Sequence, residues 1–411
     1  MAALLAGPAY ATTCSTVTTT NPDCVTKAVT TALTTGAPWT SSAITTAVGT
    51  ANVGDIYIAS GGSVAISTAN AGAITVDSSN YVYSDGPITN KDATSGSGIL
   101  VDLANNPNLS AKSFTNAAGT TITGSGIYLD AAGAIDMSGT GTTKHGIWLY
   151  NSAYAADATN TTVHTYTGDI TFNAGSSVVM NGTTGVGLAL DPYSTLNGNV
   201  TFATSSTMAL TGDSSVGILM SQNSTLAGDL NLGGSLKVTQ TTGTSTTASA
   251  LYGLVMDGQV NGDIVLPSGG SVVINGAGAT GMSIQGTGVS GSISIGGTLE
   301  TVGISSTLQQ NQVSSTTIFP EAGSALVVSA SVGHGIAVLG NTYASEGVTA
   351  GIVSSQGLGP AIDIDPGVNT IVTPALQTSS LVIGVYTTNG TAYADTSDPG
   401  FSFYNRGSVT A

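Results

Sequence analysis

Aspartate recurs at one position of a repeated sequence pattern, where a row of carboxylates could bind calcium. The pattern is a glycine, an apolar residue, any residue and a second apolar residue. The aspartates that follow it are Asp102, Asp130, Asp191, Asp257 and, with alanine in place of the glycine, Asp365. Aspartate also ends strands by accepting main-chain N–H bonds in Asx turns, and uncharged residues in the other copies limit repulsion between like charges. We therefore interpret these five as turn aspartates, with a calcium ladder as the alternative, and predict no metal site.

A histidine between two glycines is the strongest sign of catalysis in the sequence. The segment Gly333-His334-Gly335 is similar to the Gly-His-Gly element of polygalacturonases, which are β-helical enzymes. Those enzymes also use paired aspartates and an Arg-Ile-Lys clamp, whereas the single arginine here, Arg406, is followed by glycine. Asp363 and Asp365 lie two residues apart and could serve in glycosidic acid–base chemistry, but no cation or histidine lies near them in the sequence. We predict no catalytic residue.

The charge of the chain excludes several classes of partner. Its 411 residues include 22 acidic and 6 basic ones, so the net charge is −16. Six cations cannot form the basic patch that nucleic acid requires, and the same acidity disfavours an anionic membrane surface. Because 41% of the residues are hydrophobic, the chain is not a disordered acidic tail.

The first 49 residues differ from the rest of the chain. Residues 1–11 resemble the end of a secretory signal peptide, with Ala9-Tyr10-Ala11 as a small-x-small cleavage site. Cys14 and Cys24 follow closely, and in an exported protein such a pair is expected to form a disulfide. Apolar residues at helical spacing from Val25 to Leu33 predict a short helix. We therefore expect residues 12–49 to form an N-terminal cap.

From about residue 50 a unit of about 30 residues repeats, which indicates a stacked array. Each unit has three short segments in which apolar residues alternate with others, the signature of strands. The first begins with Gly-Asp-Ile or a similar triplet, and its aspartates, Asp55, Asp169, Asp229 and Asp263, receive the same turn interpretation. Three strands per unit, joined by Gly, Asn, Ser and Thr turns, make one coil, and coils stack through parallel pairing.

The predicted fold is thus an all-β, right-handed parallel β-helix over residues 50–411, with about 12 coils and a length of about 60 Å. On the third strand, alternate residues face outward, and several of them are apolar. Tyr128, Trp148, Leu219 and Val255 are candidates for one outward stripe that could contact a sugar ring or a partner chain, but we favour the interpretation that a covering loop or lateral packing accounts for them.

The Gly-Ile-x-Leu coils, the low charge and the closing segment Phe401-Ser-Phe-Tyr-Asn405 are similar to the passenger region of alphaproteobacterial autotransporters. This resemblance covers about residues 50–411. It implies export to the bacterial cell surface by a C-terminal outer-membrane β-barrel, which we expect to follow the present sequence. It also implies a non-enzymatic role in adhesion, cell–cell or biofilm contact, with a surface carbohydrate, a protein or a second copy as partner and without a cofactor. A carbohydrate-active β-helix enzyme and a self-assembling coat or filament subunit are the alternatives.

Overall fold

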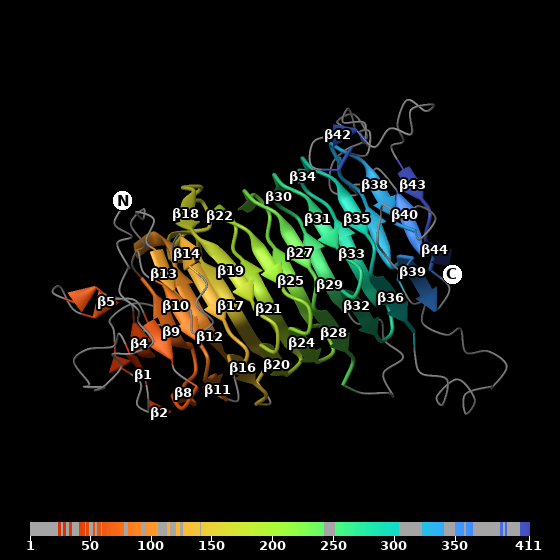
Figure 1. Ribbon diagram of the computed structural model, residues 1–411. Coiled ribbons are helices and arrows are strands. Elements are labelled where there is room, and N and C mark those ends of the chain that lie inside the picture. The colour runs from red at the N-terminus through yellow and green to blue at the C-terminus, as the bar shows by residue number, and fades with distance from the viewer. Residues whose placement is uncertain are drawn as a thin grey trace, which may run out of the picture.

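The fold is known from a computed structural model of the whole chain (Figure 1). It describes short strands within residues 24–53, then residues 56–105, 113–115, 121–123, 126–241, 251–303, 323–340, 350–364, 387–388, 391–392 and 403–411, apart from gaps at 59, 78–80, 92–94, 140 and 357–358. Residues 1–11, Cys14, Asp55 and Asp365 lie outside the described residues, so their predicted roles stay predictions.

Three long sheets run side by side along the molecule, and each contains eleven described strands. The first sheet consists of β1 (Cys24–Val25), β7 (Ile56–Ile58), β10 (Val82–Ser84), β15 (Gly126–Leu129), β19 (Asp169–Phe172), β23 (Val200–Phe202), β27 (Leu230–Leu232), β31 (Ile264–Leu266), β35 (Ile293–Ile295), β38 (Ile336–Val338) and β43 (Phe403–Asn405). The second sheet consists of β2 (Ala28–Val29), β8 (Ser63–Ile66), β11 (Pro87–Asn90), β16 (Ala134–Met137), β20 (Ser177–Asn181), β24 (Thr207–Thr211), β28 (Ser235–Thr239), β32 (Ser271–Asn275), β36 (Thr298–Val302), β39 (Ile352–Gln356) and β44 (Ser408–Thr410).

The third sheet consists of β3 (Leu33–Thr34), β4 (Ser41–Thr45), β9 (Ala71–Val76), β12 (Ser95–Asp102), β17 (Thr143–Tyr150), β21 (Thr184–Leu190), β25 (Val216–Met220), β29 (Tyr252–Met256), β33 (Thr280–Ile284), β37 (Leu326–Val328) and β40 (Ile362–Ile364). The pair β3–β4 at the start of this sheet is antiparallel. Three further antiparallel pairs lie outside the long sheets: β5 (Ala47–Val48) with β6 (Asn52–Val53), β13 (Ser113–Thr115) with β14 (Thr121–Thr123), and β41 (Thr387–Thr388) with β42 (Thr391–Ala392).

Apart from β3, which pairs antiparallel with β4, the strands of the three long sheets pair in parallel with their counterparts one coil away, which confirms the predicted parallel β-helix (Figure 1). In the first sheet Ile127 pairs with Ile170, and Ile170 pairs with Val200. Each coil therefore supplies the main-chain hydrogen bonds that its neighbours need, which a single coil could not satisfy alone. Eleven strands at about 4.8 Å give a stack about 50 Å long, slightly shorter than predicted.

One large hydrophobic core runs through the described stack from Ile56 to Ala361. The inward residues predicted from the alternation on the third strand, such as Leu188 and Ile218, are fully buried within it. Larger side chains also stack from coil to coil: the rings of Phe172 and Phe202 lie 4.2 Å apart and nearly parallel.

The repeated glycine of the third-sheet strands is explained by the narrow corner between the second and third sheets. A Cβ atom at Gly187 would overlap with the sulfur of Met208, an inward side chain of β24, and with the carbonyl oxygen of Gly217 in the next coil. The same conflict arises at Gly217, with Leu236 of β28. The glycine is therefore required because it lets the two sheets approach each other.

Five coils contain a fourth short strand that the three-segment pattern did not include. This fourth sheet consists of β18 (His164–Thr167), β22 (Ser194–Asn197), β26 (Thr225–Leu226), β30 (Gln259–Val260) and β34 (Gly288–Val289). Each strand buries one large apolar side chain, such as that of Leu196 or Leu226, two positions before the glycine of the next unit. That single apolar residue is the sequence signal for the fourth strand.

The short helix predicted between Val25 and Leu33 is wrong. The backbone there forms β1, β2 and β3, and β1 and β2 pair in parallel with β7 and β8 of the next coil. β-Branched residues such as Val25 and Val29 fit a strand that can pair with an existing edge, and this tertiary pairing overrides the helical spacing. The coil arrangement therefore begins before residue 50. The described helices are α1 (Ser152–Ala156) and the 3-10 turn Leu103–Asn105.

Candidate functional site

Three of the four candidates for the outward stripe lie in one column of the third sheet. Trp148 pairs with Ala189, Ala189 with Leu219, and Leu219 with Val255 on successive strands β17, β21, β25 and β29. Leu100 of β12 precedes Trp148 in the same column. The stripe is therefore continuous over these strands, with Leu219 and Val255 half-buried at its open part.

Tyr128 does not belong to this column. It lies on β15 of the first sheet, where it pairs with Tyr83 and Thr171. The placement of Gly126–Leu129 on the third strand was wrong because strands of the first and third sheets share the same Gly-apolar-x-apolar pattern. On the first sheet Tyr128 contacts a separate aromatic cluster in which the rings of Tyr57 and Tyr83 stack 4.9 Å apart.

Trp148 is covered rather than open, because only 9% of its surface is exposed. Its ring stacks on His145 at 4.0 Å and packs against Tyr150 at 4.5 Å. Its Nε1 donates a hydrogen bond of 2.7 Å to Oδ1 of Asp191. The indole thus has two aromatic neighbours within the chain and little exposed surface to offer a sugar ring.

His145 is held neutral by its surroundings. It is 8% exposed, and burial lowers its pKa to about 3. Its Nδ1 is buried without a hydrogen-bond partner. The role of this side chain is therefore to support the indole of Trp148 as an uncharged ring.

The turn aspartates divide between two sheets. Asp102, Asp191 and Asp257 end strands of the third sheet, whereas Asp130 ends β15 of the first sheet. Asp130 accepts hydrogen bonds from the hydroxyl of Tyr83 and from the main-chain N–H of Ala131. Described carboxylates of this set therefore do not form one ladder of adjacent ligands.

Asp191 is the most perturbed of them. Besides the indole N–H, its carboxylate accepts the main-chain N–H of Asn151 at 3.0 Å. Burial raises its pKa to about 6, while the two hydrogen bonds lower it by a smaller amount. Asn151 in turn caps α1 by accepting the N–H of Tyr154. Asp191 thus ties one coil to the helix that follows the neighbouring coil.

The aspartates beside the first-sheet glycine form a ladder that links coils. Oδ1 of Asp169 accepts the main-chain N–H of Asn199 at 2.7 Å, and Asn199 does the same for Asp229 at 2.9 Å. The ladder continues from Asp229 to Asp263 and ends on Ser292. These side chains are therefore main-chain acceptors, as the turn interpretation proposed, but each serves the next coil rather than its own turn.

The residues that suggested catalysis do not come together. His334 is exposed in the turn before β38 of the first sheet, whereas Asp363 lies on β40 of the third sheet. No group of three His, Cys, Asp or Glu side chains suited to a metal ion occurs in the part of the chain that the structure describes. Among the described residues, likewise, no helix has the length and hydropathy to cross a membrane.

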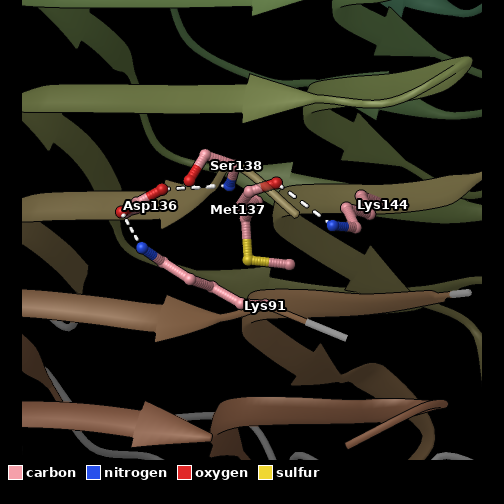
Figure 2. Close-up of polar contacts among 5 residues, drawn as sticks. All are labelled: Lys91, Asp136, Met137, Ser138 and Lys144. Atoms are coloured by element: carbon pink, nitrogen blue, oxygen red, sulfur yellow. Dashed lines mark hydrogen bonds and ion pairs between the residues drawn. The ribbon is translucent and has the colours of Figure 1, made fainter. Parts of the chain in front are cut away.

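Sequence reasoning missed two lysines, of which Lys91 follows β11 of the second sheet and Lys144 lies on β17 of the third sheet. Figure 2 shows the Nζ of Lys91 paired with Asp136 at 2.9 Å, and the Nζ of Lys144 directed to the main-chain oxygen of Met137 at 3.3 Å. Lys144 is 1% exposed, whereas Lys91 lies at the surface. The sequence signal for the ion pair is Asp136, an outward residue of the second segment in its unit. Compared with known proteins, the chain matches no family model, no curated protein and no solved structure.

Proposed function

We propose that the chain is a non-enzymatic rod, exported to the bacterial cell surface, where it mediates adhesion or contact between cells. The observation that supports this most is the use of its hydrogen-bonded and buried polar groups. Asp191 and the Asp169–Asn199 ladder are occupied in tying coils together, and His145 supports Trp148. Groups of a kind that would otherwise suggest a catalytic centre thus stabilise the stacking of the coils.

The resemblance to autotransporter passengers supports the same proposal. In a rod of this kind the stack separates the cell from whatever the outward turns and half-buried stripe residues contact. Leu219 and Val255 supply an apolar strip there, and a weak contact repeated along a rod gains avidity from multivalency.

The experiment uses intact cells that produce the full chain. We expect antibodies against the folded rod to label unpermeabilised cells, and deletion of the chain to lower attachment or cell clumping. Labelling only after permeabilisation would overturn the proposal. So would release of reducing sugar ends from a polysaccharide by the purified chain, which would favour the carbohydrate-active enzyme.

A self-assembling filament or coat subunit is the second candidate, because apolar side chains are exposed at the last strands of two sheets. Phe403 on β43 and Ile364 on β40 are 37% and 40% exposed, although their columns are buried in the preceding coils. Such strand edges can pair with another chain. Particles that lengthen with protein concentration in electron micrographs would favour this candidate over a single displayed rod.

A further inference from the structure

The outward face of the second sheet differs from the other faces in its charge. Its strands from β8 to β36 contain Asp136, Lys237 and Glu300, and Lys91 follows β11. Two positive and two negative groups cancel on this face. A chain with a net charge of −16 repels its own copies at long range, and a neutral face is where two copies can meet with the least repulsion.

The central column of this face has a self-complementary order. Successive strands place Asp136, Val179, Ala209 and Lys237 side by side in register. Val179 is 37% exposed, which is unusual for a large apolar side chain in this molecule, and Lys237 is exposed. If a copy is turned by 180° about an axis between β20 and β24, Asp136 faces the partner's Lys237, and Val179 faces the partner's Ala209.

The residues towards both ends of the column also avoid like-charge pairs in this arrangement. Thr89 precedes Asp136 in the column, and Val273 follows Lys237, so that Thr89 meets the partner's Val273. Ala65 meets the partner's Glu300 in the same way. No like charges oppose each other, which is the condition for an isologous twofold contact.

The axis between β20 and β24 lies at the middle of the eight strands from β8 to β36, so all eight overlap. Eight strands at about 4.8 Å, each about five residues wide, cover roughly 600 Å² per copy, or about 1,200 Å² in total. This is the lower limit for specific protein complexes. Hydroxyl side chains border the column, for example Ser235 and Ser271, whose Oγ atoms lie 3.1 Å apart, and they can form a polar rim.

We propose that the chain forms a weak antiparallel homodimer in which the second sheets of two copies pack face to face about this axis. Asp136 is prepared for the contact. Burial alone raises its pKa, but hydrogen bonds from Ser138 and Lys91 outweigh this effect and keep the pKa below its usual range (Figure 2). The carboxylate is therefore charged at neutral pH and can accept a second cation from the partner. The inference does not depend on the proposed adhesive function.

The test is sedimentation velocity of the purified full chain over a range of concentrations. We expect a monomer–dimer equilibrium for the natural sequence. Asp136→Lys alone and Lys237→Glu alone each place two like-charge pairs in the homodimer and are expected to raise the dissociation constant at least tenfold, because opposed like charges cost several kcal/mol. An equimolar mixture of the two variants restores both opposite-charge pairs, so dimers are expected to return.

Thr201→Lys is the matched control, because it adds a charge to the half-buried outward column of β23 in the first sheet. It should leave the equilibrium unchanged, and circular dichroism checks that every variant is folded. A cross-linking arm uses the double variant Asp136→Cys with Lys237→Cys. These two positions lie three strands, or about 14 Å, apart within one chain. A bismaleimide shorter than this distance cannot link them within one chain, so any link that forms joins two copies.

A natural sequence that stays monomeric at all concentrations would overturn the proposal. A dimer that persists in both single variants, or a mixture that dimerises no better than either variant alone, would overturn it as well, since the contact would then lie on another face. The adhesion experiment on intact cells is independent of all three outcomes.

Discussion

The indole Nε1 of Trp148 donates a hydrogen bond of 2.7 Å to Oδ1 of Asp191, which ends the neighbouring strand of the third sheet. The acceptor is a partly buried carboxylate, and the donor is a ring that the sequence offered as a candidate for an exposed contact surface. The pair shows that an outward position on a β-helix is not the same as an accessible one.

The pKa of Asp191 predicts a specific pH dependence of stability. Because burial raises it from 3.8 to about 6 in the folded chain, the folded state binds the proton more tightly than the unfolded state between these values. The contribution of Asp191 to stability is therefore fully present below about pH 4 and is lost as the pH rises through 6, by at most about 3 kcal/mol. Asp191→Asn removes this titration while keeping one acceptor oxygen.

We expect the melting temperature of Asp191→Asn, measured relative to that of the natural sequence, to rise between pH 4 and pH 7. Thermal melts at several pH values, with circular dichroism as the signal, provide the measurement. A difference between the two proteins that stays constant over this range would contradict the prediction.

Two substitutions of Trp148 separate its packing from its hydrogen bond. Trp148→Phe keeps an aromatic ring against His145 but leaves Asp191 without the indole donor, so we expect a loss of about 1–3 kcal/mol. Trp148→Ala also removes the stacked ring and should cost about 3–5 kcal/mol. Urea unfolding followed by circular dichroism measures both, and equal losses would mean that the ring contacts contribute little.

Two glycines of the same strand provide a matched test of the narrow corner. Gly187→Ala places a Cβ atom against Met208 and the oxygen of Gly217, so we expect a loss of about 1–3 kcal/mol from overpacking. Gly185→Ala should be nearly neutral, because the nearest atom to its Cβ is Oγ of Ser215 at 3.5 Å. Melting temperatures of the two variants decide the matter, and a similar fall in both would refute the steric explanation.

The stripe is tested at its open part. The double variant Leu219→Ser with Val255→Ser removes half-buried apolar surface from β25 and β29, and we expect the chain to fold but to lose attachment of intact cells. Thr201→Ser, on an outward position of the first sheet, serves as the control in the same assay. Unchanged attachment with the double variant would remove the stripe from the proposed function.

The repeat and the inward alternation were enough to predict the parallel β-helix. Leu188, Ile218 and their counterparts occupy the core because period-two alternation leaves only one face for apolar side chains in a stacked coil. The alternation does not say which sheet a strand joins, since strands of two sheets share one pattern. This is why the sequence predicted Tyr128 on the third sheet, whereas it lies on the first.

The burial of Trp148 could not be predicted from its own strand. Its cover comes from His145, displaced to the same face across Gly146, and from Asp191 and Tyr150 of adjacent positions. Contacts of this kind depend on side chains that are far apart in the sequence or on a local change of direction of the backbone. The alternation of apolar residues along one strand predicts neither of these.

The fourth sheet makes the molecule mechanically uneven. The described coils that contain β18 to β34 have an additional row of main-chain bonds around their circumference, and a single bridge from Val289 to Val332 extends this row, whereas the other described coils show three rows. Under a pulling force or on heating, we expect the described coils with three rows to open first and the middle section to persist. Tension applied along the stack would therefore reach the middle section only after the coils with fewer main-chain bonds have opened.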